Sequence, residues 1–101
     1  MTASVHPGEI LKEDFLRPLG LSAYRLAQLL DVPQQRIADL VAGKRAVTTD
    51  TALRLGRYFQ GDARQGAHFW LALQARYDLD EALAREQIRS ELDAISPREG
   101  G

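Results

Sequence analysis

The stretch VPQQRIADLVAGKR, residues 32–45, has the spacing of a helix that buries one face. Three apolar residues recur at helical intervals on that face: Ile37, Leu40 and Val41. The first turn carries two glutamines and an arginine, which add nothing to a core. Gly43 is suited to the left-handed conformation that ends a helix, and Lys44 and Arg45 follow it. The stretch therefore predicts a helix over residues 34–42 with an exposed polar tip.

Short helical segments, separated by Gly, Pro or capping residues, account for the rest of the chain, and strand patterns are nearly absent. The first helix begins near Pro7, and we expect Pro18 and Gly20 to stop it. Capping residues predict the starts of others, among them Asp78 in a capping box. The expected ranges are 23–30, 34–42, 51–59, 67–77 and 78–95. The predicted fold class is all-α, a bundle of five or six short helices.

Length and composition exclude several classes of protein. The 101 residues fit one domain, and 45% hydrophobic and 27% charged residues are ordinary for a globular protein. The chain has no cysteine, no long apolar run and no signal-peptide pattern, so we expect a cytoplasmic protein without a membrane segment. The two histidines have no metal-ligand spacing, and no serine has a candidate base in any motif. We expect no metal, no other cofactor and no enzymatic activity.

Charge is unevenly distributed along the chain. The net charge is −1, which argues against a general polyanion binder. Residues 22–58, however, carry a net +3, whereas residues 1–21 carry −1 and residues 59–101 carry −3. The basic third contains the helix quoted above, which favours contact between that helix and nucleic acid.

The helices at 23–30 and 34–42, joined by a three-residue turn, have the helix-turn-helix pattern. Ala27 is small where the two helices would cross. An apolar wedge occupies the positions that the motif requires: Leu26, Leu30, Val32, Ile37 and Leu40. Asp31 lies where the turn usually has a left-handed glycine, a conformation that Asp tolerates better than most residues. We expect residues 1–79 to form a lambda-repressor-like DNA-binding domain and residues 80–101 a C-terminal helical extension with a frayed tail.

The polar tip of the second helix matches the chemistry of base recognition. In this motif the second helix enters the major groove, where Gln pairs with adenine and Arg with guanine. The candidate base-reading residues are Gln34, Gln35, Arg36 and Asp39. The candidate phosphate-binding residues are Ser22 at a helix start and the pair Lys44 and Arg45. The competing interpretation of such a tip is a solvated helix face, and the basic surroundings favour DNA.

Several segments together resemble the HigA-type antitoxins, a branch of the XRE-like helix-turn-helix regulators. They are HPGEIL, LRPLGLSAYRLAQLLDVPQQRI, GKRAVTTDTALRLGRYF and FWLALQARYDL, in the family's order between residues 6 and 79. The resemblance implies a dimeric DNA binder that represses its own operon. It also implies neutralisation of a partner toxin, typically a small RelE-like nuclease that cuts mRNA.

Three features depart from the family pattern. Gly56 replaces the usual Ala, which costs of order 1 kcal/mol inside a helix. Residues 60–68 form a link about four residues, or one helical turn, longer than usual, which could extend the fifth helix. Beyond Leu79 the resemblance fades.

Two further surfaces are predicted for protein partners. Apolar residues in excess of what a short last helix needs predict a two-fold interface: Leu83, Ile88, Leu92 and Ile95. Charged residues on the first helix, together with the acidic tail, predict a binding surface for a small basic toxin: Glu9, Lys12, Glu13 and Arg17. Two alternatives stay open at this point. One is a stand-alone regulator without a toxin, and the other is a helical adaptor that binds only protein.

Overall fold

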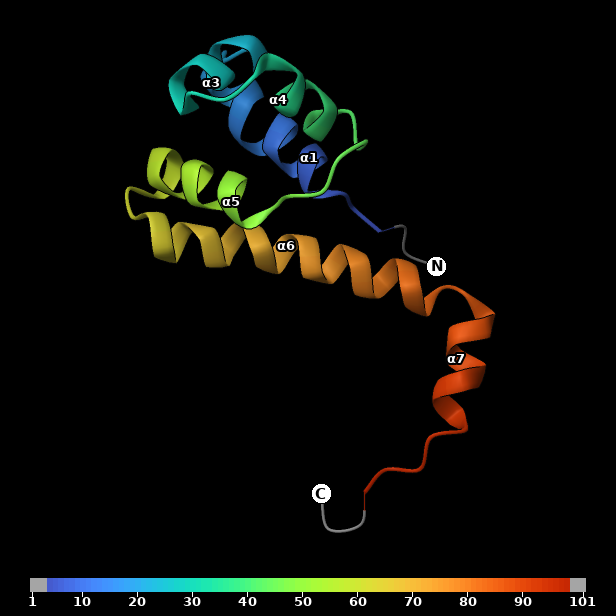
Figure 1. Cartoon of the computed structure of the whole chain (residues 1–101). Helices are drawn as coiled ribbons and strands as arrows, with labels where there is room; N and C mark the ends of the chain where they lie inside the picture. The colour runs from blue at the N-terminus through green and yellow to red at the C-terminus, as the bar shows by residue number, and fades with distance from the viewer. Residues whose placement is uncertain (1–3, 99–101) are drawn as a thin grey trace.

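Helices dominate residues 4–98, the part of the chain that the computed structural model describes (Figure 1). A first run comprises α1 (Pro7–Ile10), the π-helical η1 (Leu11–Leu16) and α2 (Arg17–Leu19). Next come α3 (Ala23–Leu30), α4 (Gln34–Val41) and α5 (Thr49–Leu55), which continues into the π-helical η2 (Gly56–Gln60). The chain ends in α6 (Ala63–Leu83) and α7 (Glu86–Asp93). The all-α prediction is confirmed. The predicted frayed tail lies partly outside the described residues, which end at residue 98.

The first helical run continues through the proline that was expected to stop it. Pro18 lies inside the last turn, and the run ends only at Gly20, whose φ of 62° is left-handed. A proline ring normally clashes with the carbonyl four residues earlier. Here the preceding turn is widened, with the Arg17 N–H donating to the carbonyl of Lys12, five residues back. The stop at Pro18 was therefore wrong, and the stop at Gly20 is confirmed.

The core lies between the first run, α3, α4, α5 and α6. Its largest fully buried side chain is Trp70, whose ring lies 5.0 Å from Phe15 between centroids. The Trp70 indole Nε1 donates to Gln60 Oε1 at 3.1 Å, so its one polar group is satisfied. Trp70, together with the partly buried Phe15, thus belongs to the core.

Two glycines allow α5 and η2 to cross α6 at backbone contact. A Cβ on Gly56 would lie 2.6 Å from the carbonyl carbon of Gly66, and a Cβ on Gly66 would lie 2.2 Å from the Cα of Gly56. Neither distance is compatible with a side chain. The glycine that departs from the family pattern is therefore matched by a second glycine across the crossing.

The long helix α6 corrects two predicted boundaries. It begins at Ala63, with Asp62 accepting from the Gln65 N–H at 2.9 Å, and not at residue 67. It then continues to Leu83, because no Gly or Pro interrupts it after Gly66. Asp78 starts no new helix; its Oδ1 accepts from Gln74 Nε2 at 2.9 Å. The extended link therefore lengthens the helix, and the proposed division between residues 79 and 80 falls within α6.

The last helix leaves the bundle. Ala84 and Arg85 separate α6 from α7, which is eight residues long and ends before the predicted residue 95. Figure 1 shows α7 projecting from the far end of α6, away from the other helices. None of the helices in residues 4–98 is both long enough and apolar enough to cross a membrane.

Candidate nucleic-acid interface

The turn between α3 and α4 has the geometry of a helix-turn-helix. Asp31 is the one non-glycine with positive φ in the described chain, at φ 58° and ψ 50°. Its N–H donates to the Gln28 carbonyl at 3.2 Å, and the Val32 N–H donates to that of Ala27 at 3.0 Å. The left-handed turn predicted for Asp31 is confirmed. The small residue at the crossing, Ala27, is 2% exposed, and the wedge residues are buried or, for Val32, half-buried.

The tip of α4 presents both glutamines to solvent. Gln34 and Gln35 are exposed, and Pro33 before them supplies no side-chain cap. Gln35 Nε2 donates to Asp39 Oδ1 at 2.7 Å, one turn further along the helix. The second N–H and the carbonyl oxygen of Gln35 are left for other partners, which is the pair that adenine recognition uses. Asp39, itself half-buried, orients this amide.

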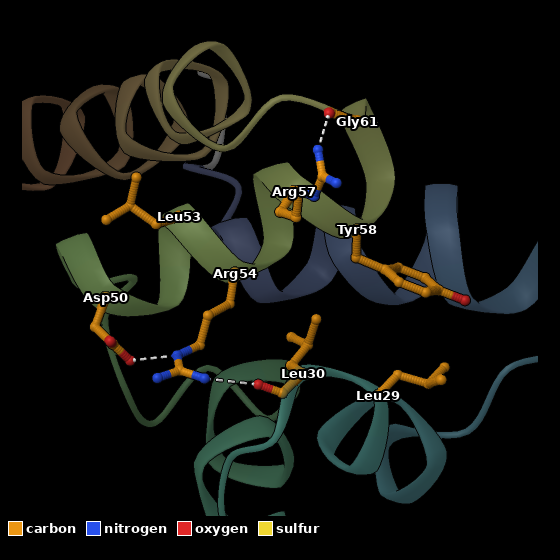
Figure 2. A pocket seen from close by; sticks show the side chains of 8 residues that line it. All are labelled: Leu29, Leu30, Asp50, Leu53, Arg54, Arg57, Tyr58 and Gly61. Carbon is orange, nitrogen blue, oxygen red and sulfur yellow. Dashed lines mark hydrogen bonds and ion pairs between the residues drawn. The ribbon is translucent and has the colours of Figure 1, made fainter.

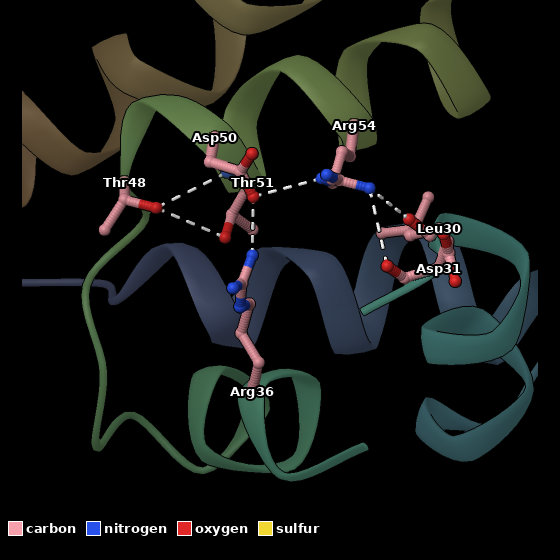
Figure 3. Close-up of polar contacts among 7 residues, drawn as sticks. All are labelled: Leu30, Asp31, Arg36, Thr48, Asp50, Thr51 and Arg54. Carbon is pink, nitrogen blue, oxygen red and sulfur yellow. Dashed lines mark hydrogen bonds and ion pairs between the residues drawn. The ribbon is translucent and has the colours of Figure 1, made fainter. Parts of the chain in front are cut away.

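Arg36 points from the same tip towards α5 (Figure 3). Its Nη1 lies 2.6 Å from Asp50 Oδ2, which also accepts from Arg54 Nε at 3.0 Å. Hydrogen bonds from Arg36 and Arg54 lower the pKa of Asp50, so its carboxylate stays ionised. Arg54 Nη1 in turn donates to the Leu30 carbonyl at 2.8 Å. The network ties α4, the turn and α5 together, and places Arg36 apart from the two outward glutamines.

Sequence reasoning did not find Asp50 and Arg54 as supports of the motif. The cap of α5 is Thr48, whose hydroxyl accepts from the Thr51 N–H at 3.4 Å, so the Asp50 carboxylate is left to pair with the two arginines. One sequence signal could have indicated this pair: Asp50 and Arg54 lie four residues apart, the spacing at which opposite charges pair on one helix face.

The loop after α4 carries the two candidate phosphate ligands. Gly43 has φ 77°, its N–H donates to Leu40 at 3.0 Å, and the Lys44 N–H donates to the Asp39 carbonyl at 2.8 Å. These two bonds close the helix end as predicted. Lys44 and Arg45 are exposed at the start of the loop. Further on, the buried N–H of Val47 donates to Gln74 Oε1 on α6 at 2.7 Å.

His6 lies beside Gly43, at the start of the same loop. Its Nδ1 accepts from the Gly8 N–H at 2.9 Å and so caps α1. The ring packs edge-on against Tyr77 of α6, 4.9 Å between centroids. Burial lowers the pKa of His6 below its ordinary value of 6.5, against the opposing effects of Asp78 and of a hydrogen bond to the Arg45 backbone. His6 thus caps α1 and packs against α6.

Ser22 uses its hydroxyl within the protein. The Oγ atom accepts from the Arg25 N–H at 3.0 Å, which confirms the predicted N-cap of α3. The residue is exposed at the start of α3. A phosphate at this helix start would therefore bind the other free N–H groups of the first turn, because the Arg25 N–H is already capped.

The residues predicted for protein partners lie away from this tip. On the first helical run, Glu13 pairs with Arg17 at 3.2 Å, and Glu9 and Lys12 are exposed. Near the C-terminus, three of the four apolar residues are 44–66% exposed and Ile88 is half-buried. These four are Leu83 at the end of α6, Ile88 and Leu92 on α7, and Ile95 after it.

Comparisons with known proteins agree with this geometry. Residues 11–64 match the helix-turn-helix family HTH_3. Virulence-associated protein I of Dichelobacter nodosus is 48% identical over 94 residues, which cover 93% of this chain and 81% of the relative. The chain belongs to the XRE-like helix-turn-helix family, on its HigA-type branch.

Two solved structures are similar over nearly the whole chain. One is the Pseudomonas aeruginosa antitoxin HigA with the higBA promoter, at 38% identity and a TM-score of 0.79, covering 93% of this chain and 97% of that one. The other is the Pseudomonas aeruginosa protein PA4674 with its operator DNA, at 39% identity and a TM-score of 0.80, covering 97% and 99%. Family membership makes the chain a HigA-like DNA-binding regulator.

Proposed function

We propose that this HigA-type protein is a dimeric repressor that binds the operator of its own operon in the cytoplasm and neutralises a RelE-like toxin. The observation that carries the DNA-binding role is the pairing of two outward glutamines on α4 with an exposed basic loop, which α6 anchors through the hydrogen bond from the Val47 N–H to Gln74. The operator and promoter complexes of the two similar proteins support it.

In this proposal Gln34 and Gln35 read bases, whereas Lys44 and Arg45 bind phosphates. Arg36 contributes by positioning α4 through Asp50, and Asp39 by orienting Gln35. The exposed N-terminus of α3 at Ser22 adds a phosphate contact. Base contacts give sequence discrimination, and phosphate contacts give affinity that depends on salt.

Binding to the DNA upstream of the gene tests these roles, with fluorescence anisotropy as the readout. Gln34→Ala and Gln35→Ala should each weaken operator binding by about 1–3 kcal/mol and leave random DNA nearly unaffected. Lys44→Ala and Arg45→Ala should each flatten the salt slope by about one unit. Gln65→Ala and Arg76→Ala, exposed on α6, are matched controls. Equal losses on both DNAs would reject base reading, and no operator binding by the native chain would favour the protein-only adaptor.

The proposed binding of a toxin rests on the acidic charge of this chain. A nuclease that acts on RNA is typically basic, and the C-terminal part of this chain is acidic, with a net charge of −3 over residues 59–101. We place the contact on the first helical run, at Glu9, Lys12, Glu13 and Arg17, because this surface is exposed and separate from the α4 tip. The double variant Glu9→Lys, Glu13→Lys should slow association with the protein encoded by the neighbouring reading frame and leave operator binding intact. Unchanged association would move the contact elsewhere, and a chain with no neutralised partner would be a stand-alone regulator.

The proposed dimer rests on the apolar residues near the C-terminal end of the described chain. Leu83, Ile88, Leu92 and Ile95 would form much of a two-fold interface. A dimer is needed because one helix-turn-helix reads only a few base pairs, and paired motifs read half-sites about 34–36 Å apart.

A further inference from the structure

An open groove of about 710 Å³ lies between the end of α3 and the outer face of α5 and η2 (Figure 2). Its apolar lining comes from Leu29, Leu30, Leu53 and Tyr58, of which all but Leu30 are 39–43% exposed. Two arginines line the groove. Arg54 Nε donates to Asp50, whereas Arg57 Nη1 donates to the Gly61 carbonyl at 2.8 Å. The groove is therefore apolar with a net positive edge.

The C-terminal arm, defined here as residues 84–95 with α7 at its centre, has the complementary character. Leu92 and Ile95 are 46% and 66% exposed. Three carboxylates lie on α7 against one arginine: Glu86, Glu91 and Asp93, with Arg89. Within residues 4–98 none of these three carboxylates forms an ion pair. The arm thus presents apolar side chains with acidic neighbours and packs against little of its own chain.

We propose that the C-terminal arm of one protomer docks into the α3–α5 groove of its partner, and that the reverse contact completes a two-fold dimer. This inference rests on the dimer of the proposed function and names the surface that receives the arm. Apolar faces that each protomer leaves exposed would cover one another, and the carboxylates of α7 would lie near Arg54 and Arg57.

The arm cannot easily fill the groove of its own chain. The groove lies beside α5, which crosses the first turns of α6, whereas α7 follows the last turn of α6 after a link of two residues. With 21 residues, α6 is about 31 Å long. This length is close to the roughly 34–36 Å between two half-sites on DNA. The helix α6 therefore places the arm far from its own groove, at a distance comparable to that between two DNA-binding units on neighbouring half-sites.

Direct packing of two arms against each other would be less favourable. Each arm carries three carboxylates against Arg85 and Arg89, a net charge of −1, so a two-fold contact between the arms would bring like net charges together. Placing each arm beside the arginines of the groove replaces that repulsion with attraction.

Cysteine cross-linking tests the contact cleanly because the chain has no cysteine of its own. Leu53→Cys and Leu92→Cys proteins, one with a longer tag, are mixed and oxidised with oxidised glutathione. We expect a disulfide-linked heterodimer in the mixture and little linkage of either variant alone. Leu19→Cys, at a residue 62% exposed on α2, mixed with Leu92→Cys gives the background rate. The inference is overturned if Leu92→Cys alone links as fast as the mixture, or if the mixture links no faster than background.

A second measurement guards against a misfolded cysteine variant. Arg57→Glu should weaken dimerisation at least tenfold by analytical ultracentrifugation, whereas Arg76→Glu on α6 should not. An unchanged dimer in Arg57→Glu would overturn the placement. Neither experiment contains DNA, so the two proposals can fail separately. A native dimer that binds operator without groove cross-links rejects only the docking, and a cross-linked dimer that ignores operator DNA rejects only the DNA role.

Discussion

Replacing Gly56 with alanine should destabilise the protein, although a helix normally gains from this change. In an ordinary helix interior the substitution stabilises by roughly 0.5–1 kcal/mol, since glycine has more conformational freedom to lose on folding. At this position the new Cβ would lie 2.6 Å from the Gly66 carbonyl carbon and 2.7 Å from the Ala67 nitrogen. Both are backbone atoms of α6, so no side chain can rotate out of the way.

The size of the loss follows from these distances. Carbon atoms pack at about 3.5–4.0 Å, so α6 would have to retreat by about 1 Å along the crossing. Overpacking of this kind costs typically 1–3 kcal/mol, which exceeds the gain in helix propensity. We expect a net loss of about 1–2 kcal/mol, or roughly 5–15 °C in Tm for a domain of this size.

Urea unfolding at fixed protein concentration, followed by far-UV circular dichroism and by the fluorescence of the buried Trp70, measures the free energy of unfolding. Ala75→Gly, on an exposed face of α6, is the reverse substitution without a crossing and should cost about 1 kcal/mol. Gly56→Ala as stable as the native protein, or more stable, would show that the helices can separate freely and would refute the argument.

Two further predictions concern His6 and Asp31. Because the pKa of His6 is lowered in the folded protein, its contribution to stability is complete above pH 6.5 and is lost as pH falls through the lower folded pKa. His6→Asn, which retains a capping side chain, should therefore reduce the dependence of the free energy of unfolding on pH between pH 7 and 5. His68→Asn is the control and should leave that dependence unchanged. Asp31→Gly should stabilise by up to about 1 kcal/mol, since Asp31 holds a left-handed conformation that glycine adopts without strain; a lower urea midpoint would contradict this.

Local sequence signals predicted the helix-turn-helix well. The turn depends on one continuous stretch: the apolar wedge, the small Ala27 and the hydrogen bonds around Asp31 all lie within residues 26–40, in a motif whose spacing is known. The same holds for the caps at Ser22 and Gly43, where one residue type satisfies a neighbouring backbone group.

Contacts between distant segments were beyond such reasoning. The expected cost of Gly56 took no account of the helix crossing, because its partner, Gly66, lies ten residues away on another helix. Arg36 was grouped with the base readers because nothing near it in sequence indicates Asp50, 14 residues on. The break at Asp78 failed for a related reason: a capping box permits a helix start, but an existing helix continues unless a breaker stops it.

Because α6 is one continuous helix, three parts of the proposed mechanism share a single rigid element. Its first turns pack on η2 through the paired glycines, its middle holds the basic loop through Gln74, and its end leads into the C-terminal arm. Gln74 also donates to Asp78, which lies less than two turns before the start of the arm. Had the helix broken at Asp78, the arm could have pivoted independently of the DNA-binding loop. As folded, the same helix would set both the proposed dimer contact and the spacing of two α4 tips on DNA.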